Sequence, residues 1–222
     1  MKEKITIALD GPSGSGKSTI AKRLSGILDI LYLDTGAMYR ATALKALNSG
    51  IDTLDSEGVS GFIDNIDLKI RYMGGVQHTF LDEKDVSEEI REPRVSMAAS
   101  NISSLKCVRL KMVALQRKIA SETSCVLDGR DIGSFVLPDA DFKFYITADT
   151  DVRAKRRYKE LKEKGHDVDF ALLKKEIEQR DYNDAHRDFA PLVKASDAIE
   201  INTSYMTVEE VVDKIISVVK AG

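Results

Sequence analysis

A glycine-rich segment near the N-terminus combines closely spaced glycines with one lysine and several hydroxyl side chains. Residues 11–18 read Gly-Pro-Ser-Gly-Ser-Gly-Lys-Ser and fit the pattern G-x-x-x-x-G-K-[ST]. In such a loop, backbone N–H groups converge on phosphate oxygens, and the helix that follows adds its positive N-terminal end. Lys17 can supply a cation to the same oxygens, and the Ser18 hydroxyl can ligate Mg²⁺. A plain turn is the alternative, but the position between an apolar strand and a helix favours binding of a nucleoside triphosphate.

The arginines of the chain gather near the ends of the expected strands and helices. Two phosphate-bearing substrates need several fixed cations between them, because their own charges repel. Arg153, Arg156 and Arg157 share one helix face, where like charges are unfavourable unless an anion lies over them. We therefore expect this face to be a lid that brings cations to a transferring phosphoryl group, the alternative being that each arginine is solvated. The arginines near element ends are Arg40, Arg109, Arg130, Arg153, Arg156, Arg157, Arg180 and Arg187.

The glycine-rich loop by itself does not decide which reaction follows. A GTPase switch would need the guanine-reading sequence Asn-Lys-x-Asp, and no asparagine in this chain is followed by lysine. A motor or transporter ATPase usually has partner domains, for which 222 residues leave little room. Two reactions stay open from the residues alone: transfer of phosphate to a second substrate, and transfer to water by a regulatory ATPase.

Two aspartates directly follow short apolar runs and are candidates for assisting a metal ion. Asp34 follows residues 31–33, and Asp128 follows residues 125–127. In enzymes with this kind of loop, a second acidic group helps to hold Mg²⁺, directly or through water. The spacing does not choose between the two aspartates, and either carboxylate can instead cap a helix or a turn.

Short apolar runs alternate with helical periodicity along most of the chain. Residues 5–9 form an apolar run that ends in Asp-Gly, which is typical of a buried strand in a parallel sheet. The succession of strand, helix, strand and helix predicts an α/β fold. Further strands are expected at 31–33, 125–127, 142–146 and 198–201. Helices are expected after the glycine-rich loop, after residues 34–36, at 149–164, from about 170 to 186 and at 208–219.

The pattern changes between about residues 67 and 86. Leu68, Ile70 and Tyr72 alternate with other residues, and Gly74-Gly75 can supply the two positive φ angles of a tight turn. We expect an antiparallel hairpin here, and hence a subdomain inserted into the parallel-sheet chain. Helical periodicity then returns in a five-point apolar stripe made of Leu105, Val108, Met112, Leu115 and Ile119.

The composition is that of an ordinary globular protein. The 222 residues include 33 Lys+Arg and 36 Asp+Glu, a formal charge of −3, and 43% of them are hydrophobic. These values exclude a disordered tail, a fibre and a disulfide-stapled miniature, and they give no overall attraction to nucleic acid or anionic membranes. Cys107 and Cys125 have no neighbours at zinc-ligand spacing, and we find neither a secretory stretch nor a membrane-spanning run. We expect reduced thiols and a cytoplasmic protein.

Five segments taken together resemble the bacterial cytidylate kinase family. They read GPSGSGKST, DTGAMYR, DGRDIG, R-A-x-R-R and RDYNDAHRDFAPL, they occur in the family's order, and they span nearly the whole chain. The resemblance implies an α/β fold with a five-stranded parallel P-loop core flanked by helices, in a single kinase domain. The core would comprise residues 1–60 and 105–222, with an antiparallel monophosphate-binding insert near 61–104 and a short helical lid near 153–170. It also implies ATP-dependent phosphorylation of CMP, and of dCMP, to the diphosphate.

The resemblance further implies roles for individual residues. ATP would be held by the glycine-rich segment, namely Gly11, Pro12, Ser13, Gly14, Ser15, Gly16, Lys17, Ser18 and Thr19. The phosphate of CMP would be bound by Arg40, Arg130 and Arg187, with Thr35 nearby. The cytosine edge would be read by Ser100, Arg109 and Asp131, and the sugar hydroxyls by Arg180 and Asp184. The catalytic residues would be Lys17, Arg153 and Arg157.

The expected metal is Mg²⁺ bound through Ser18, with Asp34 or Asp128 assisting through water. The expected partners are the small molecules ATP, CMP and dCMP, with no nucleic acid and no membrane, and the expected state is a monomer. Within the same class, the alternative is a small P-loop kinase that acts on UMP, dTMP or a non-nucleotide alcohol. From a different class, the alternative is a nucleotide-binding switch that transfers phosphate only to water.

Overall fold

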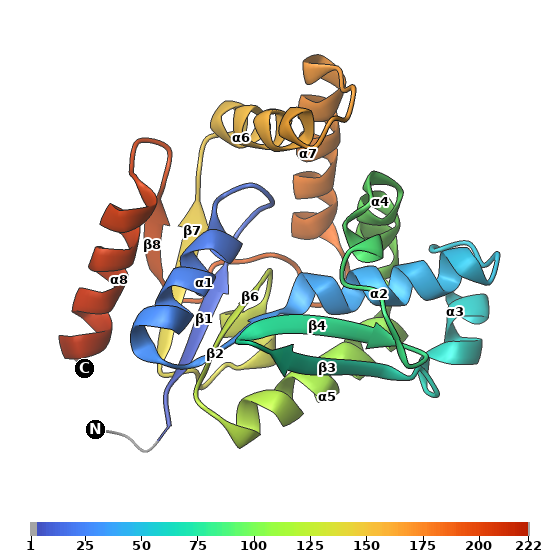
Figure 1. Cartoon of the computed structure of the whole chain (residues 1–222), viewed down its shortest axis with the longest axis horizontal. Helices are drawn as coiled ribbons and strands as arrows, with labels where there is room; N and C mark the ends of the chain where they lie inside the picture. Colours follow the sequence, from blue (N-terminus) through green and yellow to red (C-terminus); the bar gives the residue numbers. More distant parts are fainter. Residues whose placement is uncertain (1–3, 222) are drawn as a thin grey trace. The chain divides into compact units, whose positions relative to one another are not determined.

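The computed structural model describes residues 4–221 and divides into two compact units (Figure 1). The first unit consists of the described residues up to Tyr32 together with those from Thr123 onward, and the second unit is Leu33–Glu122. The insert expected at residues 61–104 lies inside the second unit, which extends beyond it on both sides.

The first unit contains most of a parallel sheet of five strands in the order β2-β6-β1-β7-β8, and the last two residues of β2 belong to the second unit. The strands are β1 (Thr6–Asp10), β2 (Leu31–Asp34), β6 (Cys125–Gly129), β7 (Phe142–Thr147) and β8 (Ile199–Asn202). Strand β1 pairs with β6 in a register that sets Ile7 opposite Val126 and Asp10 opposite Gly129. The sheet confirms the predicted α/β class, and it brings the carboxyl ends of β1 and β6 side by side.

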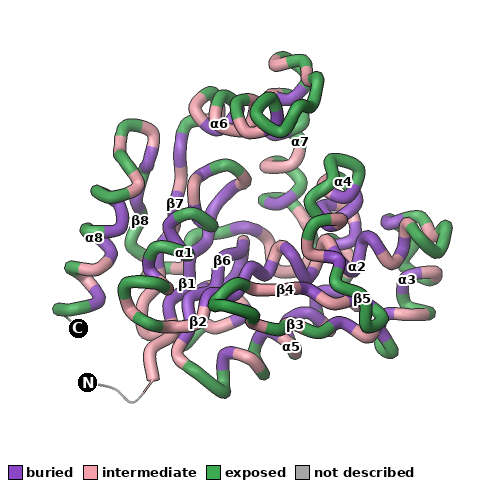
Figure 2. Tube along the Cα trace, in the orientation of Figure 1, coloured by how far each residue is buried: buried purple, intermediate pink, exposed green. Residues whose placement is uncertain are grey.

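Apolar side chains on both faces of this sheet explain why it is covered by helices. Ile7 on β1, Val126 on β6 and Phe144 on β7 are almost completely buried. Helices α1 (Lys17–Leu28) and α8 (Val208–Ala221) contribute side chains to the same apolar core. Figure 2 shows the central strands of the sheet buried and the outer faces of these helices exposed.

Two further helices of the first unit pack on each other. Helix α6 (Thr150–Glu163) is connected by a turn to α7 (Phe170–His186). Leu161 of α6 and Ile177 of α7 belong to a small apolar cluster of their own. The lid expected at residues 153–170 therefore corresponds to most of α6 and the turn that follows it.

The second unit contains an antiparallel sheet of three strands in the order β3-β4-β5. Its strands are β3 (Leu68–Met73), β4 (Val76–Leu81) and β5 (Lys84–Asp85), and its helices are α2 (Thr35–Asn48), α3 (Ser56–Ile63), η1 (Glu89–Arg91), α4 (Pro93–Ile102) and α5 (Lys106–Glu122). Between β3 and β4, Gly74 has φ 59° and Gly75 has φ 77°, and Met73 pairs with Val76. These angles confirm the predicted hairpin and its two-residue turn.

Helices α3 and α4 were not predicted from the sequence. Helix α3 contains Gly58 and Gly61, which weaken any helical pattern. It begins because the side chain of Asp55 accepts hydrogen bonds from the backbone N–H groups of Glu57 and Gly58. The only sequence signal for the start of α3 is therefore one aspartate. Hydrophobic periodicity alone does not distinguish this segment from a loop.

The apolar stripe expected on α5 is only partly the buried face of that helix. Of its five residues, Val108 and Met112 are buried, whereas the other three are half-exposed. The buried face instead includes the polar side chains of Arg109, which is 1% exposed, and Gln116, which is fully buried. A hydrophobic pattern counts both as solvent-facing, so it does not reveal that they belong to the buried face.

The cysteines are free thiols, with Cys107 partly buried and Cys125 buried. Burial raises the pKa of the Cys125 thiol to about 11, which keeps it protonated and unreactive at neutral pH. Within the described part of the chain, every helix is too short or too polar to cross a lipid bilayer.

Candidate active site

The glycine-rich loop leaves the carboxyl end of β1 and ends where α1 begins, and close packing requires two of its glycines. Gly11 has φ 143°, and a Cβ there would lie 1.9 Å from the carbonyl oxygen of Ile146. Gly14 has φ 77°, and a Cβ there would lie 3.2 Å from the Cβ of Arg153. Any larger residue would push the loop off β7 or α6. These contacts fix the path of the loop between β1 and the N-terminus of α1.

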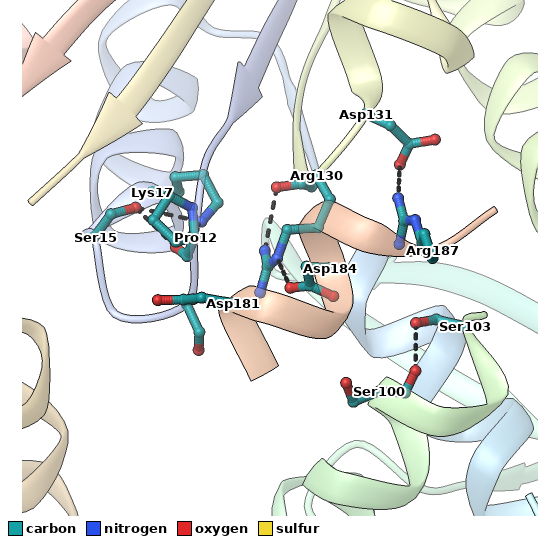
Figure 3. Close-up of polar contacts among 12 residues, drawn as sticks. Pro12, Ser15, Lys17, Ser100, Ser103, Arg130, Asp131, Asp181, Asp184 and Arg187 are labelled. Carbon is teal, nitrogen blue, oxygen red and sulfur yellow. Dashed lines mark hydrogen bonds and ion pairs between the residues drawn. The ribbon is translucent and has the colours of Figure 1, made fainter. Parts of the chain in front are cut away.

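Lys17, the first residue of α1, turns its side chain back into this loop. Its Nζ donates hydrogen bonds to the carbonyl oxygen of Pro12 at 2.7 Å and to Ser15 Oγ at 3.3 Å (Figure 3). Burial, together with the nearby charge of Arg130, lowers the pKa of Lys17 to about 7. The aspartates Asp10, Asp128 and Asp184 act in the opposite direction and favour the charged ammonium. A phosphate that replaced the carbonyl contact would strengthen that preference.

Ser18 and Asp128 form a direct pair at the start of α1. The Ser18 hydroxyl donates to Asp128 Oδ2 at 2.5 Å, and the Tyr32 hydroxyl donates to the same oxygen at 3.3 Å. A hydroxyl and a carboxylate are hard oxygen donors of the kind that Mg²⁺ takes when phosphates and waters complete its coordination. The residues present therefore fit a magnesium ion bound together with a nucleotide.

Asp34, the other candidate for assisting the metal, lies in the second unit and is already engaged. Its carboxylate caps α2 by accepting from the Ala37 N–H at 2.9 Å, and its Oδ2 accepts from Arg40 at 2.9 Å and from Arg91 at 2.8 Å. Burial raises the pKa of Asp34, but the two arginines and the cap outweigh it, so the pKa lies below its ordinary value. Asp34 holds two guanidinium groups, and Asp128 is the aspartate that meets the loop serine.

Gln77 of β4 fixes the backbone at that same aspartate. Its amide oxygen accepts from the Asp34 N–H at 2.8 Å, and its amide nitrogen donates to the Asp34 carbonyl at 3.3 Å. The inserted hairpin therefore holds the residue that orients Arg40 and Arg91.

Arg153 of α6 is built into the support of the glycine-rich loop. It is 4% exposed, and its guanidinium donates to the Ser13 carbonyl at 3.1 Å and forms an ion pair of 2.6 Å with Asp181 of α7. Its remaining hydrogen bonds reach Ala148 and Thr150 at the start of α6. The anion expected over this helix face is in part supplied by the protein itself.

The other two arginines of this helix face have different partners. Arg156 donates to the Thr203 carbonyl at 2.7 Å, and the Thr203 hydroxyl donates to the Ser15 carbonyl at 3.0 Å, so this contact also reaches the loop. Arg157 pairs with Glu160 at 2.7 Å, and both side chains are partly exposed. Arg157 thus has its ion pair with a carboxylate of its own helix, whereas Arg153 and Arg156 contact other segments.

Four residues expected at the monophosphate form two ion pairs in the first unit. Arg130 Nε donates to Asp184 at 2.8 Å, and Arg187 lies 3.2 Å from Asp131 (Figure 3). Burial alone would raise the pKa of Asp184, but the charges of Arg130, Arg180 and Arg187 hold it below its ordinary value. Asp184 therefore stays ionised and aligns the arginine forks around it.

The remaining expected residues lie in the second unit. Thr35 begins α2 and is buried, and Ser100 is buried on α4. Within the described residues, Ser100 Oγ has no hydrogen-bond partner. Arg109 is 1% exposed, and its guanidinium lies near the Ser103 carbonyl at 3.4 Å and over the Tyr39 ring at 5.5 Å. A buried serine hydroxyl without a partner is costly in an apolar interior, and a polar ligand would satisfy it.

Sequence reasoning missed two residues of these clusters. Arg91, which shares Asp34 with Arg40, stands in the charged stretch EEIREPR, where no motif separates it from surface arginines. Asp181 stands inside the segment RDYNDAHRDFAPL, so its position was available from the sequence although its partner Arg153 was not.

Comparisons with known proteins agree with one another. The family model for cytidylate kinase matches residues 7–221. A cytidylate kinase from Caldicellulosiruptor saccharolyticus is 50% identical over 214 residues, which cover 96% of this chain and 95% of that protein. A solved structure of an uncharacterised protein from Eubacterium ventriosum superposes with a TM-score of 0.54 at 18% identity, covering 99% of this chain and all of the other. A solved structure of a gluconokinase from Sinorhizobium meliloti gives a TM-score of 0.50 at 11% identity, covering 98% of this chain and 92% of that one. At such low identity, these two structures support the fold only.

Proposed function

The chain belongs to the cytidylate kinase family, and we propose that it transfers the γ-phosphoryl group of ATP to a phosphate oxygen of CMP, giving ADP and CDP. The observation that carries the proposal is the pairing of Ser18 with Asp128 beside Lys17, in a chain that matches the family over residues 7–221. The acceptor oxygen belongs to the substrate, so no protein nucleophile is needed and catalysis rests on positioning and charge.

ATP is bound by the loop of residues 11–19 at the N-terminus of α1. Lys17 exchanges its contact with the Pro12 carbonyl for a phosphate oxygen and follows the charge of the γ-phosphoryl group. Ser18 and Asp128 would hold Mg²⁺. The ion, when bound, neutralises charge on the phosphates.

CMP is bound by the arginines and aspartates that the family motifs identify. Its phosphate is bound by Arg40, Arg130 and Arg187, with Thr35 beside it. Its base is read by Ser100, Arg109 and Asp131, and its sugar hydroxyls by Arg180 and Asp184. The chemistry suits this division, since guanidinium forks match phosphate and carboxylates accept from hydroxyl and amino groups.

We add Arg91 to the residues that bind the phosphate of CMP. Arg91 and Arg40 donate to the same oxygen of Asp34, so two positive charges converge on one negative charge. Asp34 thereby holds two guanidinium groups together, and guanidinium groups match the oxygens of a phosphate. Asp34 then orients the two arginines and has no direct role with the metal.

The lid at residues 153–170 supplies charge at the transferring group. Arg157 reaches the phosphoryl group when the lid closes, and Arg153 acts from its place against the loop. We assign the P-loop core to residues 1–60 and 105–222, as the family implies. The insert that binds the monophosphate comprises residues 61–104. dCMP is a second acceptor, and the protein acts on these small nucleotides as a monomer in the cytoplasm.

The test is the release of ADP from Mg·ATP in the presence of single acceptors. CMP should give the fastest release, dCMP a measurable one, and UMP, dTMP or non-nucleotide alcohols little. Fastest release with one of those last acceptors would identify a different small kinase. Equal release with no acceptor would identify an ATPase and refute the proposal.

A further inference from the structure

Asp10, the last residue of β1, is a buried carboxylate for which the proposed reaction has no direct use. It is 5% exposed and immediately precedes Gly11. Its Oδ1 accepts a hydrogen bond from the Ile132 N–H and its Oδ2 accepts one from the Gly133 N–H, each at 2.7 Å. Both oxygens of one side chain are thus committed to two consecutive backbone amides far along the chain.

The parallel pairing of β1 with β6 explains how Asp10 reaches this segment. Asp10 lies opposite Gly129 at the carboxyl ends of the two strands, so its side chain meets the chain that leaves β6. The close approach also needs a small residue at position 133. A Cβ on Gly133 would lie 3.1 Å from the side chain of Lys143 and 3.4 Å from Asp10 Oδ2.

The two amides belong to the first residues of a short helical turn, η2 (Ile132–Val136), whose N-cap is Asp131. An N-cap aspartate ordinarily accepts from the first amides of its own helix. Asp131 makes no such cap bond, and its carboxylate is instead 3.2 Å from Arg187. Asp10 accepts from these amides in place of Asp131. The side chain of Asp131 is thereby left to pair with Arg187.

Stability alone would not favour a buried carboxylate at this position. Burial, with a smaller contribution from the nearby charge of Asp131, raises the pKa of Asp10 to about 6, although the two amides and Lys17 act to lower it. The ionised form is therefore held in the protein at a cost that an apolar side chain on β1 would not carry.

We propose that Asp10 is a positioning residue for the monophosphate site: its two oxygens fix the backbone after Asp131, so that Arg130 and Asp131 present their side chains to CMP. This inference rests on the proposed function of those two residues. Because Asp10 also adjoins Gly11, it joins the base of the ATP loop to the loop that selects the acceptor.

The test compares Asp10→Asn and Asp10→Ala with Ile7→Val, a core substitution on the same strand. Asn keeps one acceptor oxygen and Ala keeps none, so the KM for CMP should rise in that order, by about 10- to 100-fold in Asp10→Ala. The ratio of kcat/KM for CMP to that for UMP should fall in the same order, while the KM for ATP changes by less than about threefold. Ile7→Val should lower the Tm and leave the ratio and both KM values unchanged.

Amide hydrogen exchange gives a second readout that needs no turnover. In wild type, Ile132 and Gly133 should be protected, and Asp10→Asn should lose protection at one or both while the amides of β7 keep theirs. Equal increases in the KM for CMP and for ATP, or an unchanged CMP-to-UMP ratio in a folded Asp10→Asn, would overturn the inference. Wild type that released no ADP with CMP would instead refute the proposed function, and the exchange data would still report whether Asp10 anchors the segment.

Discussion

The guanidinium of Arg153 donates a hydrogen bond of 3.1 Å to the carbonyl oxygen of Ser13, so α6 is attached directly to the glycine-rich loop. Arg157, one helical turn further on, pairs only with Glu160 among the contacts the structure records, and its side chain is 29% exposed. Two arginines that the sequence groups on one helix face therefore stand in different surroundings. Arg153 supports the loop, and we propose that Arg157 turns toward a ligand.

Arg157→Ala should lower kcat while barely changing CMP binding measured without ATP. If Arg157 meets phosphate only when the lid closes, its contribution is made in the transition state and not in the binary complex. Equilibrium binding of CMP and steady-state kinetics on the same preparation check this. An equal loss of CMP affinity would place Arg157 in the monophosphate site.

Arg153→Ala serves as the matched comparison for that variant. Loss of its bonds to Ser13 and Asp181 should raise the KM for ATP and also lower the Tm, because the partly buried carboxylate of Asp181 loses its counter-charge. A Tm and an ATP KM like those of Arg157→Ala would show that the contact with the loop has no consequence.

Lys17→Ala should reduce kcat on the order of 10²-fold or more. The substitution removes a cation that follows the γ-phosphoryl charge, which is comparable to deleting one charge-stabilising donor. Lys22→Ala, which changes an exposed lysine of the same helix, is the control and should keep its rate. Near wild-type kcat in a folded Lys17→Ala protein would remove Lys17 from catalysis.

Binding of a non-hydrolysable ATP analogue should take up a proton at about pH 8 but not at about pH 6. Burial, followed by the charge of Arg130, lowers the pKa of Lys17 to about 7, so at the higher pH most of the free protein carries neutral Lys17. Phosphates favour the ammonium and raise this pKa on binding, whereas at the lower pH the group is already charged in both states. Calorimetry in two buffers of different ionisation enthalpy measures the uptake. Lys17→Met should abolish the pH 8 uptake, and an unchanged uptake would assign it to another group.

Asp131→Ala should reduce the preference for CMP over UMP by at least an order of magnitude. Cytosine offers an amino donor at N4 with acceptors at N3 and O2, whereas uracil offers an acceptor at position 4 and a donor at N3. A carboxylate and a guanidinium therefore match cytosine and oppose uracil, and a site of this kind can discriminate by about 10⁴-fold. The measurement is kcat/KM for both nucleotides in both proteins. A parallel fall for the two would mean that Asp131 serves mainly to pair with Arg187.

Arg91→Ala should weaken CMP binding about tenfold, the loss expected for one charge-assisted hydrogen bond. Arg94→Ala is the matched control, because Arg94 lies three residues on and pairs with Glu92 instead of Asp34. Titration of each protein with CMP at two salt concentrations checks the prediction, and the difference should shrink at the higher one. Equal affinity of the two variants would return Arg91 to a structural pairing with Asp34.

Local patterns of the sequence determined the elements and the class of the site. The spacing of glycines, Lys17 and Ser18 identifies the loop, and Gly74-Gly75 identifies the hairpin. Backbone dihedral angles and burial on one face restrict the residue types within a few neighbouring positions, so a short segment is enough to detect them. The order of motifs along the chain identified the family. The sequence also placed Asp34 and Asp128 after strands, but it did not decide which of the two carboxylates assists the metal.

Only the tertiary structure separated those two aspartates and revealed the anchors of the site. Ser18 meets Asp128 and Asp10 meets Ile132 across more than 100 residues of chain, because the parallel register of β1 and β6 brings their carboxyl ends together. Burial of Arg109 on α5 was likewise invisible to a pattern that treats charge as exposure. Contacts of this kind depend on which strands are neighbours and in what register, and that choice is made by the packing of the whole core and not by any short segment.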